Sequence, residues 1–167
     1  MRTVVFSLLV ENTSGVVSHI SGLFSRRGYN IDSFSSGITT DPRYTRITIV
    51  STGDDEILEQ IEKQLAKLED VIEIRQLTPD NSVTRELVLI KVSADESNRS
   101  EIIALTNIFR ANIIDVSLDS MIIELTGTQS KLDAFIDLVR KYHILELART
   151  GASGLFRGTE NVYRMKE

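Results

Sequence analysis

The sequence predicts an α+β protein built from two tandem β-α-β-β-α-β domains, each with an antiparallel sheet. Strand-like and helix-like segments alternate along the 167 residues, and a polar stretch containing one of the two prolines lies near the middle. The same order of elements follows on both sides of that stretch. This order is that of the ferredoxin-like, split βαβ fold, and the length allows two small domains.

The first half supplies one complete set of elements. Residues 3–10 are rich in β-branched and aliphatic side chains, as strands are. From Val16 onward, apolar residues recur at helical spacing until Gly28, which follows two arginines where a helix C-cap is expected. The acidic residues 54–56 favour a second helix start, because the helix dipole attracts negative charge there. The remaining expected elements are strands over 29–38, 44–51 and 71–77.

The second half repeats this plan after a linker. We assign residues 1–78 to the first domain, 79–84 to the linker, and 85–167 to a second domain with a flexible tail. Residues 98–101 resemble a capping box at the start of a helix. Apolar positions in the last helix of each half align without a gap, and a Thr-Gly pair precedes both, which favours a duplication. The aligned positions are Leu58, Ile61 and Leu65 with Leu132, Phe135 and Val139, and the expected strands are 86–92, 112–117, 121–125 and 144–148.

The composition is that of a folded cytoplasmic protein and argues against several functions. A net charge of -5 gives no basic surface for nucleic acid or anionic lipid. Without cysteine there can be no disulfide, thiolate metal site or cysteine nucleophile. No apolar run is long enough to span a bilayer, and the start of the chain resembles neither a signal peptide nor a transit peptide.

The loop before the first helix is the segment that best suits a ligand. The first turn of a helix has unpaired N–H groups and a partial positive charge, so a carboxylate can bind there. Gly15 has no Cβ to keep a ligand away from the backbone. The Asn12 amide can both donate and accept, which suits the ammonium and carboxylate of a free amino acid. The same residue types are common in turns, so the pattern alone leaves an ordinary turn as the alternative.

A second asparagine, Asn30, begins the second expected strand. In a split βαβ sheet the first strand is central and the second lies on an edge. Asn30 and Asn12 therefore need not be neighbours within one chain. They could meet across a dimer made by edge-to-edge pairing of two sheets, which would also cover an exposed edge.

Several longer segments carry a family resemblance. The N-terminal block LVENTSGVV (9–17), followed by GLFSRRGYNI (22–31), is the most specific of them. Further segments are RITI (46–49), LEQIEKQL (58–65), FRANIIDV (109–116), GTQSKLDAF (127–135) and ARTG (148–151). Together they span nearly the whole chain, and they resemble the ACT-domain small regulatory subunit of acetolactate synthase (acetohydroxyacid synthase).

The resemblance implies a sensor of the end product in branched-chain amino-acid synthesis. Valine would bind between the N-terminal ACT domains of a homodimer, and leucine or isoleucine are possible effectors as well. The subunit would activate the large catalytic subunit and confer feedback inhibition on it. Thiamin diphosphate, Mg²⁺ and FAD would belong to that catalytic subunit, so this chain would be non-catalytic and hold no cofactor or metal. The residues implied to contact valine are Asn12, Ser14, Gly15, Val16, Val17, Asn30 and Ile31.

The second half departs from this site pattern. At residues 94–98 it has Ala-Asp-Glu-Ser-Asn, without glycine and with two carboxylates that would repel the carboxylate of an amino acid. We therefore expect an ACT-like fold without the ligand site, free to serve the catalytic subunit or the dimer. The segment after Gly151 is either a flexible tail or a segment that orders on the catalytic subunit, with Leu155 and Phe156 as anchors.

Other functions fit less well. A stand-alone ACT-type sensor could regulate a different enzyme. A ferredoxin-like RNA-binding module has the same order of elements, but it needs aromatic residues on its central strands, which residues 46–50 lack. The two histidines, His19 and His143, are isolated and do not suggest a zinc site. The sequence contains no nucleophile-elbow or P-loop pattern.

Overall fold

The structure is a computed structural model and describes residues 1–159. Contacts divide the chain into two compact units. The first contains residues 1–84 together with the segment that begins at Ala152, and the second contains residues 85–151. Each unit has an antiparallel sheet and two α-helices, so the predicted α+β class with two βαββαβ domains is confirmed. Among the described residues, no helix is long and apolar enough to cross a bilayer.

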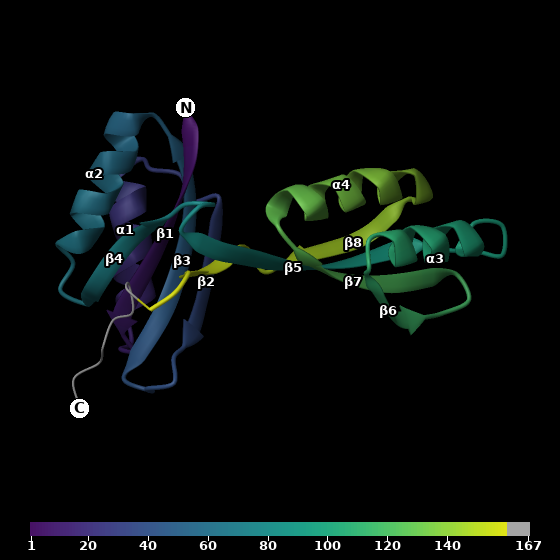
Figure 1. Ribbon diagram of the computed structural model, residues 1–167, viewed down its shortest axis with the longest axis horizontal. Helices are drawn as coiled ribbons and strands as arrows, with labels where there is room; N and C mark the ends of the chain where they lie inside the picture. The colour runs from purple at the N-terminus through teal and green to yellow at the C-terminus, as the bar shows by residue number, and fades with distance from the viewer. Residues whose placement is uncertain (160–167) are drawn as a thin grey trace. The chain divides into compact units, whose positions relative to one another are not determined.

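The first unit follows the predicted order of elements. They are β1 (Arg2–Glu11), α1 (Val16–Arg27), β2 (Ser33–Ile38), β3 (Tyr44–Gly53), α2 (Asp55–Ala66) and β4 (Val71–Leu77). The strands are antiparallel in the order β2-β3-β1-β4, so β1 is central and β2 lies at an edge. Helices α1 and α2 lie together on one face of this sheet (Figure 1).

The core of the first unit lies between the helices and the sheet. Side chains alternate between the two faces of a strand, and every second residue of β1 is buried beneath the helices. The apolar residues of both helices meet them at helical spacing. Full burial of one such side chain stabilises the fold by about 1.5–3 kcal/mol. The largest buried side chains here are Phe6, Leu8, Ile20, Phe24, Ile47, Ile49, Leu58, Ile61 and Leu65.

The second unit repeats this arrangement. Its elements are β5 (Ser82–Ser93), α3 (Arg99–Ile108), β6 (Asn112–Val116), β7 (Ser120–Gly127), α4 (Gln129–Val139), the 3₁₀ turn η1 (Arg140–Tyr142) and β8 (Ile144–Arg149). The strand order is β6-β7-β5-β8, which matches the first unit strand for strand. The core is again confined to the face beneath the helices, and it centres on Ile90, Ile102, Ile123, Leu132 and Phe135.

Local signals at helix ends were partly correct. Asp54 caps α2 by accepting a hydrogen bond from the Ile57 N–H at 2.9 Å, as the acidic start predicted. Gly28 ends α1 in the left-handed conformation, where a Cβ is unfavourable. The predicted capping box at 98–101 is wrong. The Asn98 side chain accepts from the Asp95 N–H instead, and the Glu101 carboxylate accepts from the Tyr142 hydroxyl.

Two element boundaries differ from the sequence expectation. Strand β2 begins at Ser33 and not near residue 29, because the chain after α1 first turns through the left-handed Gly28 and the Tyr29 N–H bonds back to the Phe24 carbonyl. Residues 82–84, expected in the linker, are already the first residues of β5. Ser82 is buried and its hydroxyl donates to the Thr78 carbonyl, which fixes the turn into the strand.

The segment after the second unit returns to the first one. Ser153–Phe156 forms the strand β9, which pairs with β5. The Ala152 N–H donates to the Ser33 hydroxyl at 3.0 Å, and the Arg157 N–H donates to the Asn81 carbonyl at 2.8 Å. We call residues 152–157 the C-terminal clasp. The expected flexible tail is therefore wrong for this segment, because its backbone has hydrogen-bond partners in the first unit. Residues 160–167 lie outside the described residues.

The packing of Gly154 makes the clasp testable. A Cβ at this position would come within 2.7 Å of Leu77 Cδ1, 2.8 Å of Thr84 Cγ2 and 3.2 Å of the Val83 carbonyl oxygen. Gly154→Ala should therefore lower the free energy of unfolding by about 1–3 kcal/mol, as overpacking does. Gly37→Ala is the matched control, because a Cβ there meets nothing within 4 Å. Equal urea midpoints for the two variants would contradict the close packing of the clasp.

Candidate functional site

The start of α1 is open to a ligand on its backbone side. Gly15 occupies the N-cap position with a φ of 98°, a conformation that favours glycine, and its lack of a side chain leaves the helix without a side-chain cap. A Cβ placed there would meet nothing within 4 Å. The first-turn N–H groups of a helix have no partner within the helix itself. The Val16 N–H bonds to the Thr13 carbonyl at 3.5 Å, so the next N–H groups of the turn are the free donors, and they lie with a partial positive charge at an unobstructed position.

Asn12 lies beside this helix start and is held by the turn before β3. Its side-chain amide donates to the Pro42 carbonyl at 2.9 Å, and its backbone N–H donates to the Arg43 carbonyl at 2.8 Å. Within the described residues the Asn12 side-chain oxygen has no hydrogen-bond partner, so it can accept from an ammonium group. The turn before β3 therefore fixes the orientation of Asn12, which lies between β1 and α1.

That turn is itself stabilised by an ion pair. Arg43 donates to the Asp41 carboxylate from its backbone N–H at 3.0 Å and from its guanidinium at 2.6 Å. The hydrogen bond from the Arg43 side chain and, to a smaller extent, that from its backbone N–H hold the pKa of Asp41 below the usual value. The guanidinium carbon also lies 5.5 Å from the centre of the Tyr44 ring.

The remaining residues that the resemblance implies for the site differ in how exposed their side chains are. Ser14 is exposed beside Gly15. Val16 is buried in the core, whereas the side chain of Val17 is 46% exposed on the outer surface of α1. Ile31 packs against the core of the first unit. Val17 is the residue of this group that can meet an aliphatic ligand without rearrangement.

Asn30 lies at the opposite end of the sheet from Asn12. The Asn30 carbonyl accepts from the Ser51 hydroxyl at 2.6 Å, near the end of β3, and its side-chain amide donates to Asp32. Asn12 lies beside the start of β3 instead, because Glu11 pairs with Tyr44. The eight residues from Tyr44 to Ser51 make seven steps along a strand, which span roughly 23 Å. One chain therefore does not bring Asn12 and Asn30 together.

The corresponding loop of the second unit is occupied by its own side chains. Asp95 accepts from the Ser97 hydroxyl and, at 2.8 Å, from the Ser97 N–H. The hydrogen bond from the Ser97 hydroxyl and, to a smaller extent, that from the Ser97 backbone N–H hold the pKa of Asp95 below its usual value. At the N-cap of α3, the position that Gly15 occupies in α1, this loop has Asn98, and the Asp95 carboxylate before it is already bonded within the loop.

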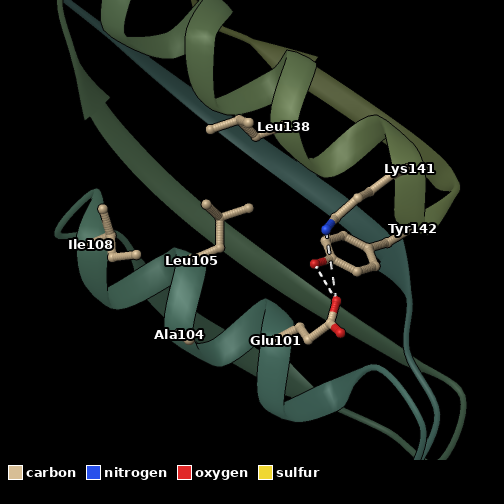
Figure 2. Close-up of a pocket in the computed structure, with 7 residues that line it drawn as sticks. All are labelled: Glu101, Ala104, Leu105, Ile108, Leu138, Lys141 and Tyr142. Atoms are coloured by element: carbon tan, nitrogen blue, oxygen red, sulfur yellow. Dashed lines mark hydrogen bonds and ion pairs between the residues drawn. The ribbon is translucent and has the colours of Figure 1, made fainter.

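A groove that the sequence did not predict lies between the helices of the second unit. Figure 2 shows Leu105 and Ile108 of α3 facing Leu138 of α4, with a volume of about 350 Å³ between the elements. At one end the Glu101 carboxylate accepts from the Tyr142 hydroxyl at 2.8 Å, and Lys141 Nζ lies 3.7 Å from that carboxylate. The polar groups of the groove thus pair with one another. The only feature of the sequence that could have indicated this groove is the presence of apolar residues on the facing sides of α3 and α4.

Metal-ligating side chains do not gather in the described part of the chain. Residues 1–159 contain no group of three or more histidine, aspartate or glutamate side chains that could hold a metal ion. His19 is mostly exposed on α1, where its Nδ1 lies 2.6 Å from Asp70.

The Asp41–Arg43 pair predicts a pH dependence for the turn that holds Asn12. Because the pKa of Asp41 is lowered in the folded state, the contribution of this pair to stability is present above the ordinary aspartate pKa. It should be lost as the pH falls through the lowered value. Arg43→Gln should raise the pKa of Asp41 toward its ordinary value, measured by NMR titration of the carboxyl carbon. The lowered pKa of Asp95 should not change, and a parallel shift of both carboxyls would contradict a local cause.

Comparisons with known proteins agree across the whole chain. Residues 6–73 match the family model of the ACT domain of acetohydroxyacid synthase small subunits, and residues 85–158 match the model described as the small subunit of acetolactate synthase. A protein of Methanothermobacter thermautotrophicus named "Probable acetolactate synthase small subunit" is 50% identical over 161 residues, which cover 96% of each chain.

Two further relatives extend this agreement. The acetolactate synthase isozyme 3 small subunit of Escherichia coli is 46% identical over 92% of this chain and 95% of its own length. The crystal structure of the acetolactate synthase small subunit of Thermotoga maritima superposes with a TM-score of 0.87 at 43% identity, covering 95% of this chain and 99% of that one. On these matches, the chain belongs to the family of acetolactate synthase small subunits.

Proposed function

We propose that this chain is the valine-binding regulatory subunit of acetolactate synthase. In this proposal it activates the catalytic subunit and confers feedback inhibition by valine. The observation that carries the proposal is the uncapped start of α1 at Gly15, with Asn12 held beside it. Family membership supports the partnership with a catalytic subunit, which carries the thiamin diphosphate, Mg²⁺ and FAD in this proposal.

The chemistry of the helix start suits a free amino acid. The N–H groups of the first turn favour its carboxylate, because they carry a partial positive charge. The free side-chain oxygen of Asn12 can accept from the ammonium group. The exposed Val17 side chain gives an aliphatic contact for a branched side chain. A wall of this kind distinguishes ligands that differ by one methylene by about 1–3 kcal/mol, so leucine and isoleucine should bind more weakly without being excluded.

The sheet topology explains how Asn30 can take part. Strand β2 is an edge strand, and Ile38 at its end pairs with Thr45, which in turn pairs with Val10 near Asn12. If two β2 edges pair antiparallel about a two-fold axis, the Ser33 end of one strand meets the Ile38 end of the other. Asn30 of one protomer then lies at the same end of the double sheet as Asn12 and Gly15 of its partner. The proposed dimer has two such sites.

Calorimetric titration with valine tests the site. Asn12→Ala removes the acceptor, and Gly15→Asp places a negative charge where the carboxylate would bind, so both should abolish saturable binding at valine concentrations that saturate the wild type. Asn107→Ala is a control at an exposed asparagine of the second unit. Gly158→Asp is a control at another glycine with positive φ and open space. Valine binding that survives both site variants would place the site elsewhere.

Subunit mixing tests whether the site is shared between protomers. Asn12→Ala and Asn30→Ala dimers should each bind no valine. After subunit exchange at equal amounts, about half of the dimers are mixed, and each mixed dimer has one site with both asparagines intact. Calorimetry should then recover about a quarter of the wild-type number of sites. No recovery in a sample whose exchange is verified by mass spectrometry would refute a site built across the dimer.

A further inference from the structure

We propose that the C-terminal clasp positions the loop that carries Asn30 and Ile31, and thereby forms a structural part of the effector site. The inference rests on the proposed function, because it concerns how that site is held in shape. The positioning residues are Ser33, which receives the clasp, and Gly154, which lets the clasp lie close to the sheet.

The strand registers show that the clasp lies across the sheet face opposite the helices. Ser33 pairs with Val50, Val50 with Val5, and Val5 with Leu77, so these residues form a row across all four strands. Val4, the neighbour of Val5, is buried beneath the helices, so the row lies on the other face. The clasp meets both ends of this row: the Ala152 N–H bonds to Ser33, and Gly154 lies against Leu77.

The clasp has firm anchors away from β2. The Arg157 N–H donates to the Asn81 carbonyl at 2.8 Å. The Phe156 ring centre lies 5.5 Å from the Arg75 guanidinium, a cation–π contact with β4. Strand β9 also pairs with β5. Because these contacts do not involve β2, the bond to Ser33 ties the edge strand to an independently held support.

The loop before β2 has few attachments besides the packing of Tyr29 and Ile31 against the core. Within the described residues, β2 pairs with β3 alone. The loop itself is fixed by the Asp32 N–H, which donates to the Val50 carbonyl at 2.8 Å, and by the bond from Ser51 to the Asn30 carbonyl. Ser33 follows Asp32 directly. Release of Ser33 therefore gives the backbone that carries Asn30 more freedom, and a ligand that must order it again binds more weakly.

The test compares serine variants of the full-length chain in valine titrations. Ser33→Ala removes the acceptor for the Ala152 N–H, and the affinity should fall by up to about fivefold, the worth of one hydrogen bond. Ser33→Thr keeps the oxygen and should restore it. Ser35→Ala, two positions along the same strand and face, is the matched control and should leave the affinity unchanged. In a Gly154→Ala background, where the clasp is already displaced, Ser33→Ala should have no further effect.

Hydrogen exchange of the amino-acid-free chain gives a second readout that does not depend on valine. Ser33→Ala should speed exchange of the Asp32 amide and leave the amides of β1 unchanged. Equal affinities for Ser33→Ala and wild type, equal losses in Ser33→Ala and Ser35→Ala, or unchanged exchange at Asp32 would each overturn the inference. A wild-type chain that ignores valine even with its catalytic subunit would overturn the proposed function instead. Faster exchange at Asp32 would still show the tether in that case.

Discussion

Two helices cover only one face of a four-stranded sheet, so each unit has to deal with the other face separately. In the first unit, residues that point away from the helices are nevertheless buried, among them Leu9, Thr48 and Val50. The clasp covers part of this face at Leu77. The need to cover this second face explains why β9 returns to the first unit. It also explains why the first unit is discontinuous in sequence and how β2 is supported.

The second unit leaves the same face open. Leu89 and Ile122 are partly exposed there, around the ion pair of Lys91 with Glu146, and they line a hollow of about 550 Å³. The bulge in each central strand aligns Leu89 with Ser7 of the first unit, and Lys91 with Leu9. One architectural plan has therefore diverged both at its helix starts and on its free sheet face. The two units therefore differ in their loops and free faces rather than in their shared fold.

Much of this architecture followed from local sequence patterns. The periodic apolar positions predicted the order of elements in both units, and the split βαβ topology predicted that β1 would be central and β2 an edge strand. The same topology indicated that Asn12 and Asn30 need not be neighbours within one chain. The Gly-rich stretch at 151–158 carries no strand signal of its own, because its β conformation comes from pairing with β5, about 70 residues earlier in the chain.

In the candidate site, too, some features follow from local sequence patterns and others depend on tertiary contacts. Gly15 and Asn12 were recognisable, because an open helix start requires a small residue and a nearby amide. The turn at 41–43 that orients Asn12 was not assigned a role in the site, since its link to Asn12 runs through backbone carbonyls that any residue types could supply. The capping box at 98–101 failed because tertiary partners competed for both side chains: Asp95 for Asn98, and Tyr142 with Lys141 for Glu101.

The discontinuity of the first unit also bears on how the protein is made. During translation, residues 1–84 emerge from the ribosome early, but the clasp emerges only after the whole second unit has been synthesised. The row from Ser33 to Leu77 stays uncovered during that interval, and its closure requires contacts between residues more than 70 positions apart, which form slowly. The nascent chain thus completes its amino-terminal unit last, so a product that is truncated before the clasp has all four strands of the first sheet but leaves one face of it uncovered.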